Sequence, residues 1–235
     1  MFKSKKRKLV HLVFKKILKK YDLMNDIMSF GLHRLWKNNF IKSINIKSGQ
    51  IVLDLACGTA DISEKIIKLF GTSIKLILVD SNYDMIQLGR EKIRNAGNIK
   101  NIYYLQSEAE NLPFLQNSFD HVIISFGIRN FFDKSKSLKS IHKILKKKGK
   151  LSILEFSMPN NKTFKKIYNF YSFKVIPILG KIVSGQKFAY KYLVNSIRHF
   201  PKRNKFKNML IKKGFKKVKF QKKFFGIITI YQGEK

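Results

Sequence analysis

The 235-residue sequence carries 49 lysine and arginine residues against 14 aspartate and glutamate residues, a formal net charge of +35, and a single cysteine, Cys57. One cysteine excludes an internal disulfide framework, and because no histidine–cysteine cluster has metal-ligand spacing, no metal site is predicted. No apolar run approaches the ~20 residues of a membrane span, and the basic start 1–8 leads into a segment too charged for a signal-peptide core. We expect one cytoplasmic domain.

The positive charge provides attraction to anionic surfaces such as phosphates and lipid headgroups. Nearly all of it is lysine, accompanied by abundant isoleucine, asparagine and phenylalanine and little alanine. That profile is typical of a nucleotide bias in the coding sequence, in which lysine fills solvated positions. We therefore predict no nucleic acid partner from the charge.

A helical region over residues 9–45 is predicted to precede the first strand. Short runs rich in β-branched and aromatic residues then alternate with helical patterns, which favours crossover units and a mostly parallel sheet with helices on both faces. The predicted strands of this α/β core are 51–56, 74–80, 101–106, 119–126 and 150–157.

The alternation stops after Ser157. Residues 158–200 are rich in aromatic side chains and form a predicted helical insertion, and 204–214 gives a last helix. The runs 215–221 and 224–232 are separated by so few residues that they must pair antiparallel. The expected single domain thus has a helical N-terminal cap (1–45), a core (46–157), the insertion (158–200) and a final helix and strand pair (201–235).

The stretch 51-IVLDLACGTADIS-63 is an apolar strand that ends in Asp54, a turn of small residues and a helix start. In open α/β sheets, ligands bind beyond the carboxyl ends of the strands, and the first such turn is the usual contact. The turn lacks the GxGxxG pattern that a dinucleotide needs. Asp54 can engage a cationic amino group, Gly58 allows close approach and Thr59 offers a hydroxyl; the alternative for Asp54 is a turn-forming role.

The second strand ends in Asp80, where a carboxylate can accept hydrogen bonds from both hydroxyls of a ribose. The alternative is that Asp80 caps the helix starting near Asn82. After the third strand, 107-SEAENLPF-114 could meet an adenine ring, and after the fourth, Ser125 lies at the strand end with Arg129 and Asn130 over the expected pocket mouth. Cys57 has no identified base and is interpreted as a small turn residue.

These motifs make the chain similar to the ubiquinone/menaquinone biosynthesis C-methyltransferase family, which uses S-adenosylmethionine. The similarity runs nearly end to end and is most specific in 21-YDLMNDIMSFGLHRLWK-37, 125-SFGIRNFFDK-134, 154-LEFSMP-159, 168-YNFYSFKVIPILGKIV-183 and 190-YKYLVNSI-197. The Asp-small-Gly turn alone indicates only a class I methyltransferase with a Rossmann-like sheet.

The resemblance implies that Thr59 contacts the methionine part of the cofactor, Asp80 its ribose, Glu108 and Ala109 its adenine, and that Ser125 lines the pocket. Where the family has Asn, this chain has Glu108, which can still accept from the adenine amino group. Ala60 replaces the last glycine of the usual turn, which tests whether that position needs a positive φ.

The implied reaction methylates a ring carbon of a polyprenylated quinol. This carbon becomes nucleophilic when a ring hydroxyl loses its proton. Candidates at the hydroxyl are Arg129, whose charge favours the phenolate, with Asn130 and Tyr21 orienting a proton-accepting water; the alternative for Arg129 is a surface salt bridge. His33 and His199 are further candidate bases, or structural histidines.

An apolar channel for the prenyl tail is expected from residues 164–193 with Ile27, Met28, Phe30 and Trp36. Lysines near its mouth would draw the protein to the inner face of an anionic cytoplasmic membrane. The resemblance leaves a homodimer or a quinone-biosynthesis complex open. The rival interpretations are an RNA methyltransferase on the same fold, disfavoured by the scarcity of arginine and the absence of an NPPY-type tetrad, and a noncatalytic lipid- or partner-binding subunit.

Overall fold

A computed structural model describes residues 10, 12, 13, 16, 18–97, 100–159, 161–185 and 187–235, without the side chains of residues 19, 21, 183, 184 and 187. The strands of the single sheet are β1 (Ile51–Leu55), β2 (Lys75–Asp80), β3 (Ile102–Gln106), β4 (Phe119–Ser125), β5 (Leu145–Phe156), β6 (Lys216–Lys223) and β7 (Ile228–Glu234). Their order is β3-β2-β1-β4-β5-β7-β6.

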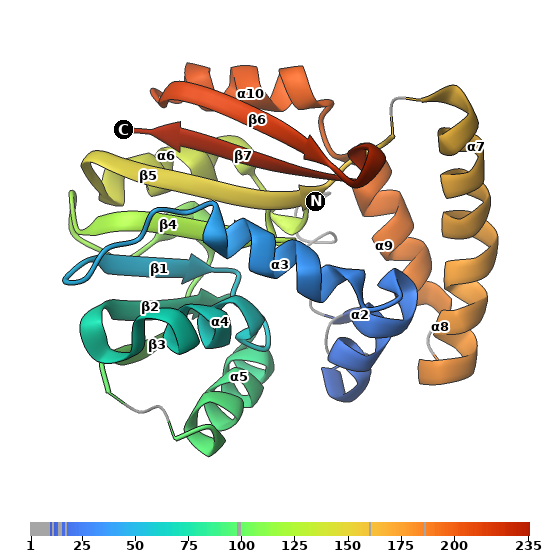
Figure 1. The fold of residues 1–235 in the computed structure, drawn as a ribbon, viewed down its shortest axis with the longest axis horizontal. Helices are drawn as coiled ribbons and strands as arrows, with labels where there is room; N and C mark the ends of the chain where they lie inside the picture. Colours follow the sequence, from blue (N-terminus) through green and yellow to red (C-terminus); the bar gives the residue numbers. More distant parts are fainter. Residues whose placement is uncertain are drawn as a thin grey trace.

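The helices connect and cover these strands (Figure 1). The α-helices are α2 (Tyr21–Ser29), α3 (Leu32–Lys42), α4 (Asp61–Phe70), α5 (Tyr83–Asn95), α6 (Lys134–Ile144), α7 (Lys162–Phe170), α8 (Ile176–Ser184), α9 (Lys187–His199) and α10 (Arg203–Lys212). The short turns are η1 (Leu18–Lys20), η2 (Gly71–Ser73), η3 (Ala109–Asn111), η4 (Ile128–Asn130), the π-helical η5 (Tyr171–Val175) and η6 (Phe224–Gly226).

Strands β1 to β5 pair parallel with their neighbours, and β7 pairs antiparallel with both β5 and β6. The predicted fold class, a mostly parallel sheet with an antiparallel final strand, is therefore confirmed. Order β3-β2-β1-β4 reverses direction between β1 and β4, and such a switch point opens a crevice at the carboxyl ends of the strands. Asp54 and Asp80 occupy adjacent strand ends because Leu55 is in register with Val79.

Two apolar clusters pack against the two faces of the sheet. One cluster includes Val122, Ile124 and Leu138 under α6 and α10, and the other includes Val52, Leu78 and Ile66 under α3, α4 and α5. Central strands buried on both faces explain why β1, β2 and β4 appear in the sequence as continuous apolar runs.

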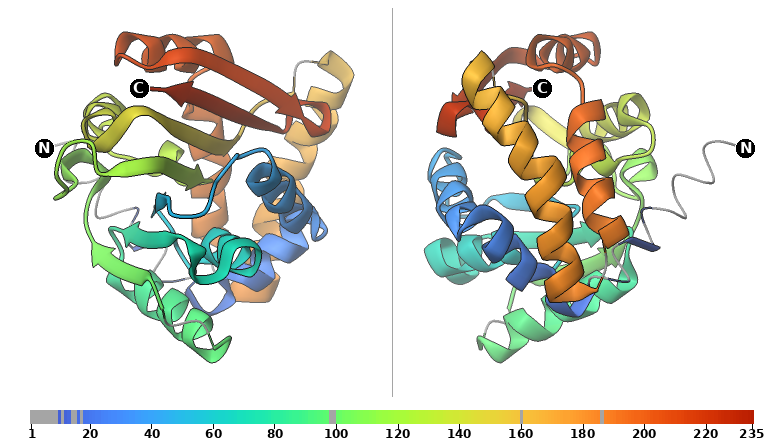
Figure 2. Two further views of the ribbon diagram at one scale, coloured as in Figure 1. Left: turned by 60° about the vertical axis from the view of Figure 1, so that its left-hand side comes forward. Right: turned by 90° about the vertical axis from the view of Figure 1, so that its right-hand side faces the viewer.

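The helices α2, α7, α8 and α9 form a separate group beyond the carboxyl ends of the parallel strands (Figures 1 and 2). Their own small core includes Met24, Ile176, Ala189, Tyr190 and Val194. α7, η5 and α8 run on as one long rod beside α9, as the right panel of Figure 2 shows. None of the described helices is both long enough and apolar enough to cross a lipid bilayer.

Strand β5 begins at Leu145, five residues before the predicted start at Lys150. The polar run in this extension contacts β4 and the C-terminus. Leu145 is in register with Phe119, Lys146 Nζ donates to Asp120 Oδ2 at 2.7 Å, and the Lys235 N–H donates to the Gly149 carbonyl oxygen at 3.0 Å. The lysines of this segment therefore belong to the sheet.

Candidate active site

The turn between β1 and α4 is built from left-handed residues. Ala56, Gly58 and Ala60 have φ angles of 59°, 53° and 64°. The chain folds back so that the Cys57 N–H donates to the Val79 carbonyl oxygen at 3.1 Å. The position where Ala60 replaces glycine thus does adopt a positive φ, which is unfavourable for alanine by about 1 kcal/mol or more.

Two neighbouring glycines let other elements approach this turn. A Cβ placed on Gly89 of α5 would lie 2.9 Å from Ala60 Cβ, and one placed on Gly127 would lie 2.6 Å from Ala56 Cβ. Both separations are too short for real side chains, so the turn is clamped between α5 and the segment after β4. The clamp fixes the turn's backbone before any ligand arrives.

Asp54 at the end of β1 is almost fully buried, and Ser63 Oγ donates to its Oδ2 at 2.6 Å. Burial is the largest influence on this carboxyl and raises its pKa to about 7, although the Ser63 hydrogen bond works in the opposite direction. A buried carboxyl that titrates in this range favours an incoming cation, because the cation stabilises its charged form. Asp54 also lines the main cavity of the molecule.

Asp80, the last residue of β2, forms hydrogen bonds that connect β2 to the turn after β1. Its Oδ2 accepts from the Gly58 N–H at 2.9 Å and its Oδ1 from the Asn82 N–H at 2.9 Å. Burial raises its pKa, opposed by these backbone hydrogen bonds. The N-cap of α5 is Asn82, whose side chain accepts from the Met85 N–H. Each carboxylate oxygen has a second lone pair, so Asp80 can still accept hydroxyl hydrogen bonds from a ribose.

The remaining predicted cofactor residues are distributed around this edge. Thr59 Oγ1 donates to Asp22 Oδ1 of α2 at 2.9 Å. Glu108 immediately precedes η3, and the buried Ala109 begins it. Ser125 ends β4, and its buried Oγ has no hydrogen-bond partner among the described residues. Such an orphaned polar atom on a cavity wall suits a bound ligand.

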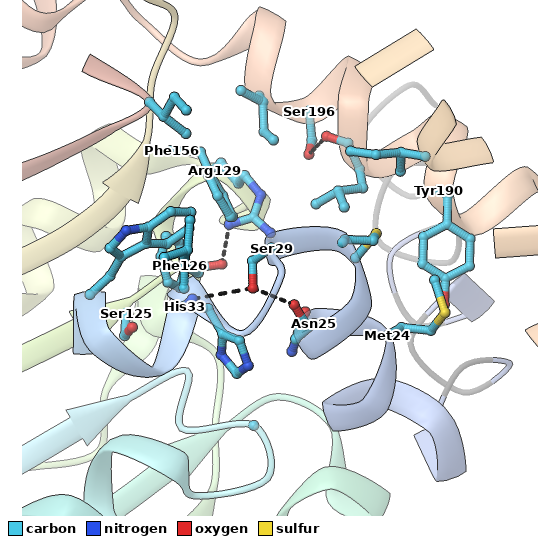
Figure 3. A pocket seen from close by; sticks show the side chains of 18 of the residues that line it. Met24, Asn25, Ser29, His33, Ser125, Phe126, Arg129, Phe156, Tyr190 and Ser196 are labelled. Carbon is cyan, nitrogen blue, oxygen red and sulfur yellow. Dashed lines mark hydrogen bonds between the residues drawn. The ribbon is translucent and has the colours of Figure 1, made fainter. Parts of the chain in front are cut away.

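We call residues 54–60, which connect β1 to α4, the acidic turn. A cavity of about 300 Å³ lies between this turn and the helical group of α2, α7, α8 and α9 (Figure 3). At one end it is lined by Asp54, Gly58, Thr59 and Ser125. Its apolar and aromatic walls come from α2, α3, η5 and α9 and include Met24, Met28, Trp36, Tyr171, Tyr190 and Leu193. Asp80, Glu108 and Ala109 are not among the residues that line it.

Arg129 was expected over the pocket mouth, where its charge would favour a phenolate, with a surface salt bridge as the alternative. Arg129 lines the cavity, and the surface alternative is wrong because its salt bridge is buried. Its guanidinium is buried, and Nη1 donates to Glu155 Oε1 at 2.8 Å and to the Phe126 carbonyl oxygen. Glu155 is fully buried in β5 and also accepts from the Arg129 N–H at 3.1 Å. Glu155, which no sequence pattern singled out, neutralises Arg129 and anchors η4.

The other candidate catalytic residues lie differently. Asn130 lines the cavity, and Tyr192 of α9 donates its hydroxyl to Asn130 Oδ1 at 3.2 Å. Tyr21 is the first residue of α2, but its side chain is outside the described part of the structure. His33 of α3 is buried on the cavity wall, whereas His199 is exposed at the end of α9, with Nδ1 at 2.7 Å from the Asn195 carbonyl oxygen.

Solved structures of known methyltransferases share this fold. A Thermotoga maritima S-adenosylmethionine-dependent methyltransferase, described as a possible histamine N-methyltransferase, gives a TM-score of 0.65 at 17% identity, covering 95% of this chain and 98% of that one. A Haemonchus contortus phosphoethanolamine N-methyltransferase, solved with S-adenosylhomocysteine, gives 0.63 at 16% identity, covering 85% of this chain and 52% of that one. The chain therefore has the fold of class I S-adenosylmethionine-dependent methyltransferases.

Residues 1–235 match the ubiE/COQ5 methyltransferase family, and the chain belongs to that family. It is 46% identical over 233 residues to the ubiquinone/menaquinone biosynthesis C-methyltransferase of Pasteurella multocida, covering 99% of this chain and 87% of the relative. The corresponding protein of Escherichia coli O1:K1 is 44% identical over 233 residues, covering 99% and 93%. The predicted family, C-methyltransferase activity and cofactor are thereby confirmed.

Proposed function

We propose that this protein methylates a ring carbon of a polyprenylated quinol in ubiquinone and menaquinone biosynthesis. The observation that supports this most directly is the cavity, which begins at the acidic turn and continues between apolar helices. The polar end of the cavity suits the phenolic ring of such a substrate, and the apolar helices suit its long hydrocarbon tail. Both the benzoquinol and the naphthoquinol acceptors fit this chemistry.

S-adenosylmethionine supplies a methyl group on a sulfonium, which is a strong electrophile. For its binding we propose the predicted residues: Asp54 for the amino group, Thr59 for the methionine part, Asp80 for the ribose, and Glu108 with Ala109 for the adenine. Gly58 lets the ligand approach the backbone, and Ser125 contributes its hydroxyl, which has no hydrogen-bond partner within the described part of the chain. The orphaned Ser125 oxygen and the raised pKa of Asp54 support this placement.

At the acceptor ring we propose Asn130, Arg129 and Tyr21 as contacts. Asn130 and Tyr192 form a hydrogen-bonded pair on the cavity wall that can orient a quinol hydroxyl. Glu155 balances the charge of Arg129, so this charge does little to favour a phenolate. Arg129 acts mainly by holding η4 against β5 through the ion pair. A protonated Arg129 cannot accept the hydroxyl proton, which must pass to water or to another side chain.

We further propose that α7 and α8 contact an anionic membrane. The exposed apolar side chains of α7, η5 and α8 include Ile167, Phe170, Phe173, Ile178 and Ile182. Exposed lysines of the same elements include Lys165, Lys166, Lys174 and Lys181. Exposed Phe30 and Ile167 also line the cavity, so its rim is apolar. An apolar rim beside cations allows a tail to move from the bilayer into the chamber.

The function is tested by methyl transfer from labelled S-adenosylmethionine to demethylmenaquinol and to 2-polyprenyl-6-methoxy-1,4-benzoquinol. We expect label in at least one quinol and none in RNA. Label in RNA alone would favour the rival RNA methyltransferase, and cofactor binding without transfer to any acceptor would favour a noncatalytic subunit.

Membrane contact is tested by vesicle flotation. Binding should require anionic lipid and weaken as salt rises. Phe170→Ser should reduce it, while Leu115→Ser, which alters an exposed leucine before β4, should not. Equal binding by both variants would place the contact elsewhere.

A further inference from the structure

His33 occupies the wall of the cavity close to the acidic turn. It lies in the first turn of α3, is 5% exposed, and appears in Figure 3 beside Ser29 and Asn25 of α2. The α2–α3 connection places it there because Phe30 and Gly31 both have left-handed backbone angles, which reverse the chain in two residues. His33 therefore lines the cavity from a position that this turn fixes.

Asp26 sets the protonation pattern of the His33 ring. Asp26 Oδ1 lies 2.8 Å from His33 Nε2, and Arg34 donates from Nε to Oδ1 and from Nη2 to Oδ2, each at 2.6 Å. The arginine holds the pKa of Asp26 well below its usual range, so this side chain is an ionised acceptor. Nε2 must then carry the imidazole proton, which leaves the lone pair on Nδ1.

Nδ1 of His33 is buried and has no hydrogen-bond partner among the described residues. An imidazole with one nitrogen tied to a carboxylate and the other bearing a free lone pair is the arrangement of a general base. The other carboxylates on the cavity wall have partners: Asp61 pairs with Lys37 and Lys92, and Asp54 accepts from Ser63. Arg129 pairs with Glu155.

We propose that His33, oriented by Asp26, is the general base that removes the hydroxyl proton of the acceptor ring. The O–H bond breaks and its proton passes to Nδ1, giving an imidazolium paired with Asp26. The electron pair stays on the oxygen and is delocalised to the ring carbon that will form the new carbon–carbon bond. As the new carbon–carbon bond forms, the bond between the methyl group and the sulfonium sulfur breaks and its electron pair stays on the sulfur. The methylated ring carbon then loses its hydrogen to water and the oxygen recovers the proton from Nδ1, so one proton is released per turnover.

The surroundings of His33 keep its imidazole neutral, as a proton acceptor requires. Burial is the main cause that lowers its pKa, and Lys37 on the same helix adds to the effect, while Asp26 of α2 and Asp61 of α4 oppose it. The free imidazole is therefore neutral near pH 7 and can accept a proton. Activity should fall as the pH drops through the lowered pKa, because the protonated ring no longer has its lone pair.

The kinetic test compares His33→Gln with His199→Gln, a matched change at an exposed histidine away from the cavity. His33→Gln should lower kcat about 10²-fold or more, leave KM nearly unchanged and remove the acid limb of the pH profile. His199→Gln should match the wild type. A His33→Gln enzyme with the wild-type pH profile would overturn the proposal.

A second test needs no cofactor and no turnover. A prenylated nitrophenol, whose phenolate absorbs visibly, should bind the wild type partly as phenolate below the free probe's own pKa and bind His33→Gln as the neutral phenol. Equal phenolate fractions would refute the role of His33. Because the proposal depends on quinol methylation, wild-type protein that transfers no methyl group to any quinol would instead refute the proposed function.

A third measurement covers the case that His33→Gln does not fold. Nitrogen-15 spectra of histidine-labelled wild-type protein should show His33 with the proton on Nε2. A proton on Nδ1 would remove the proposed base.

Discussion

The backbone N–H of Gly58 donates to Asp80 Oδ2 at 2.9 Å, so the acid that ends β2 also fixes the glycine of the turn after β1. The two strand ends therefore form one unit, although 22 residues separate them in the chain. A ligand that occupies the turn is held by a carboxylate that is already oriented.

Asp80→Ala is expected to weaken binding of S-adenosylhomocysteine at least tenfold, which corresponds to ~1.4 kcal/mol. The loss has two sources, the missing ribose acceptor and the freed Gly58. Asp80→Asn separates them, because its amide oxygen can still accept from one N–H. Calorimetric titration of both variants measures the difference, and wild-type affinity in Asp80→Ala would contradict the ribose assignment.

The pKa of Asp54, raised to about 7, makes both stability and binding depend on pH. The folded protein holds this proton to higher pH than the unfolded chain does, so the free energy of unfolding should decline as pH rises from about 4 to about 7 and then level. Denaturant unfolding of wild-type protein against Asp54→Asn isolates this contribution, which the amide should lack.

Binding of S-adenosylhomocysteine should show the opposite trend to stability. Its cationic amino group prefers the ionised carboxylate, so affinity should rise between about pH 6 and about pH 8, with proton release at the lower end. Calorimetry in two buffers of different ionisation enthalpy measures the released protons. The same pH dependence in Asp54→Asn would show that another group is responsible.

The buried pair of Arg129 and Glu155 predicts a rescue. Arg129→Met leaves Glu155 charged and unpaired in the core, which should cost about 3–5 kcal/mol of unfolding free energy. Adding Glu155→Gln removes that charge while its carbonyl oxygen still accepts a backbone N–H. The double variant should therefore unfold at higher urea concentration than Arg129→Met alone, and a lower midpoint would contradict the burial argument.

The contact between α8 and α9 allows no side chain at Gly180, where a Cβ would lie 2.0 Å from the Tyr190 ring. Gly180→Ala should force these helices apart and speed amide hydrogen exchange across 161–199 while leaving β1–β5 protected. Lys181→Ala, at the next, exposed position, should exchange as the wild type does. Uniform acceleration through the sheet would mean that the helical group and the sheet unfold together.

The sequence predicted the strands well because buried parallel strands are continuous apolar runs, and it predicted the acidic turn because strand ends share one edge of the sheet. It could not predict contacts that depend on packing between distant segments. Glu155 looked like one polar residue in an apolar strand, and only the fold brings Arg129 to it. Asp26 and His33 lie seven residues apart on two helices, and only the left-handed turn between them makes them neighbours.

The cavity wall is divided between two parts of the chain, with the acidic turn on the sheet and most of the apolar lining on α2, α3, η5 and α9. The turn and α3 share one packing core with the sheet, whereas α2, α8 and α9 have a core of their own. Substitutions within 161–199 can therefore retune which tail or ring is accepted without disturbing the methyl-donor site. Divergence in acceptor preference among proteins built this way would be concentrated in that helical segment.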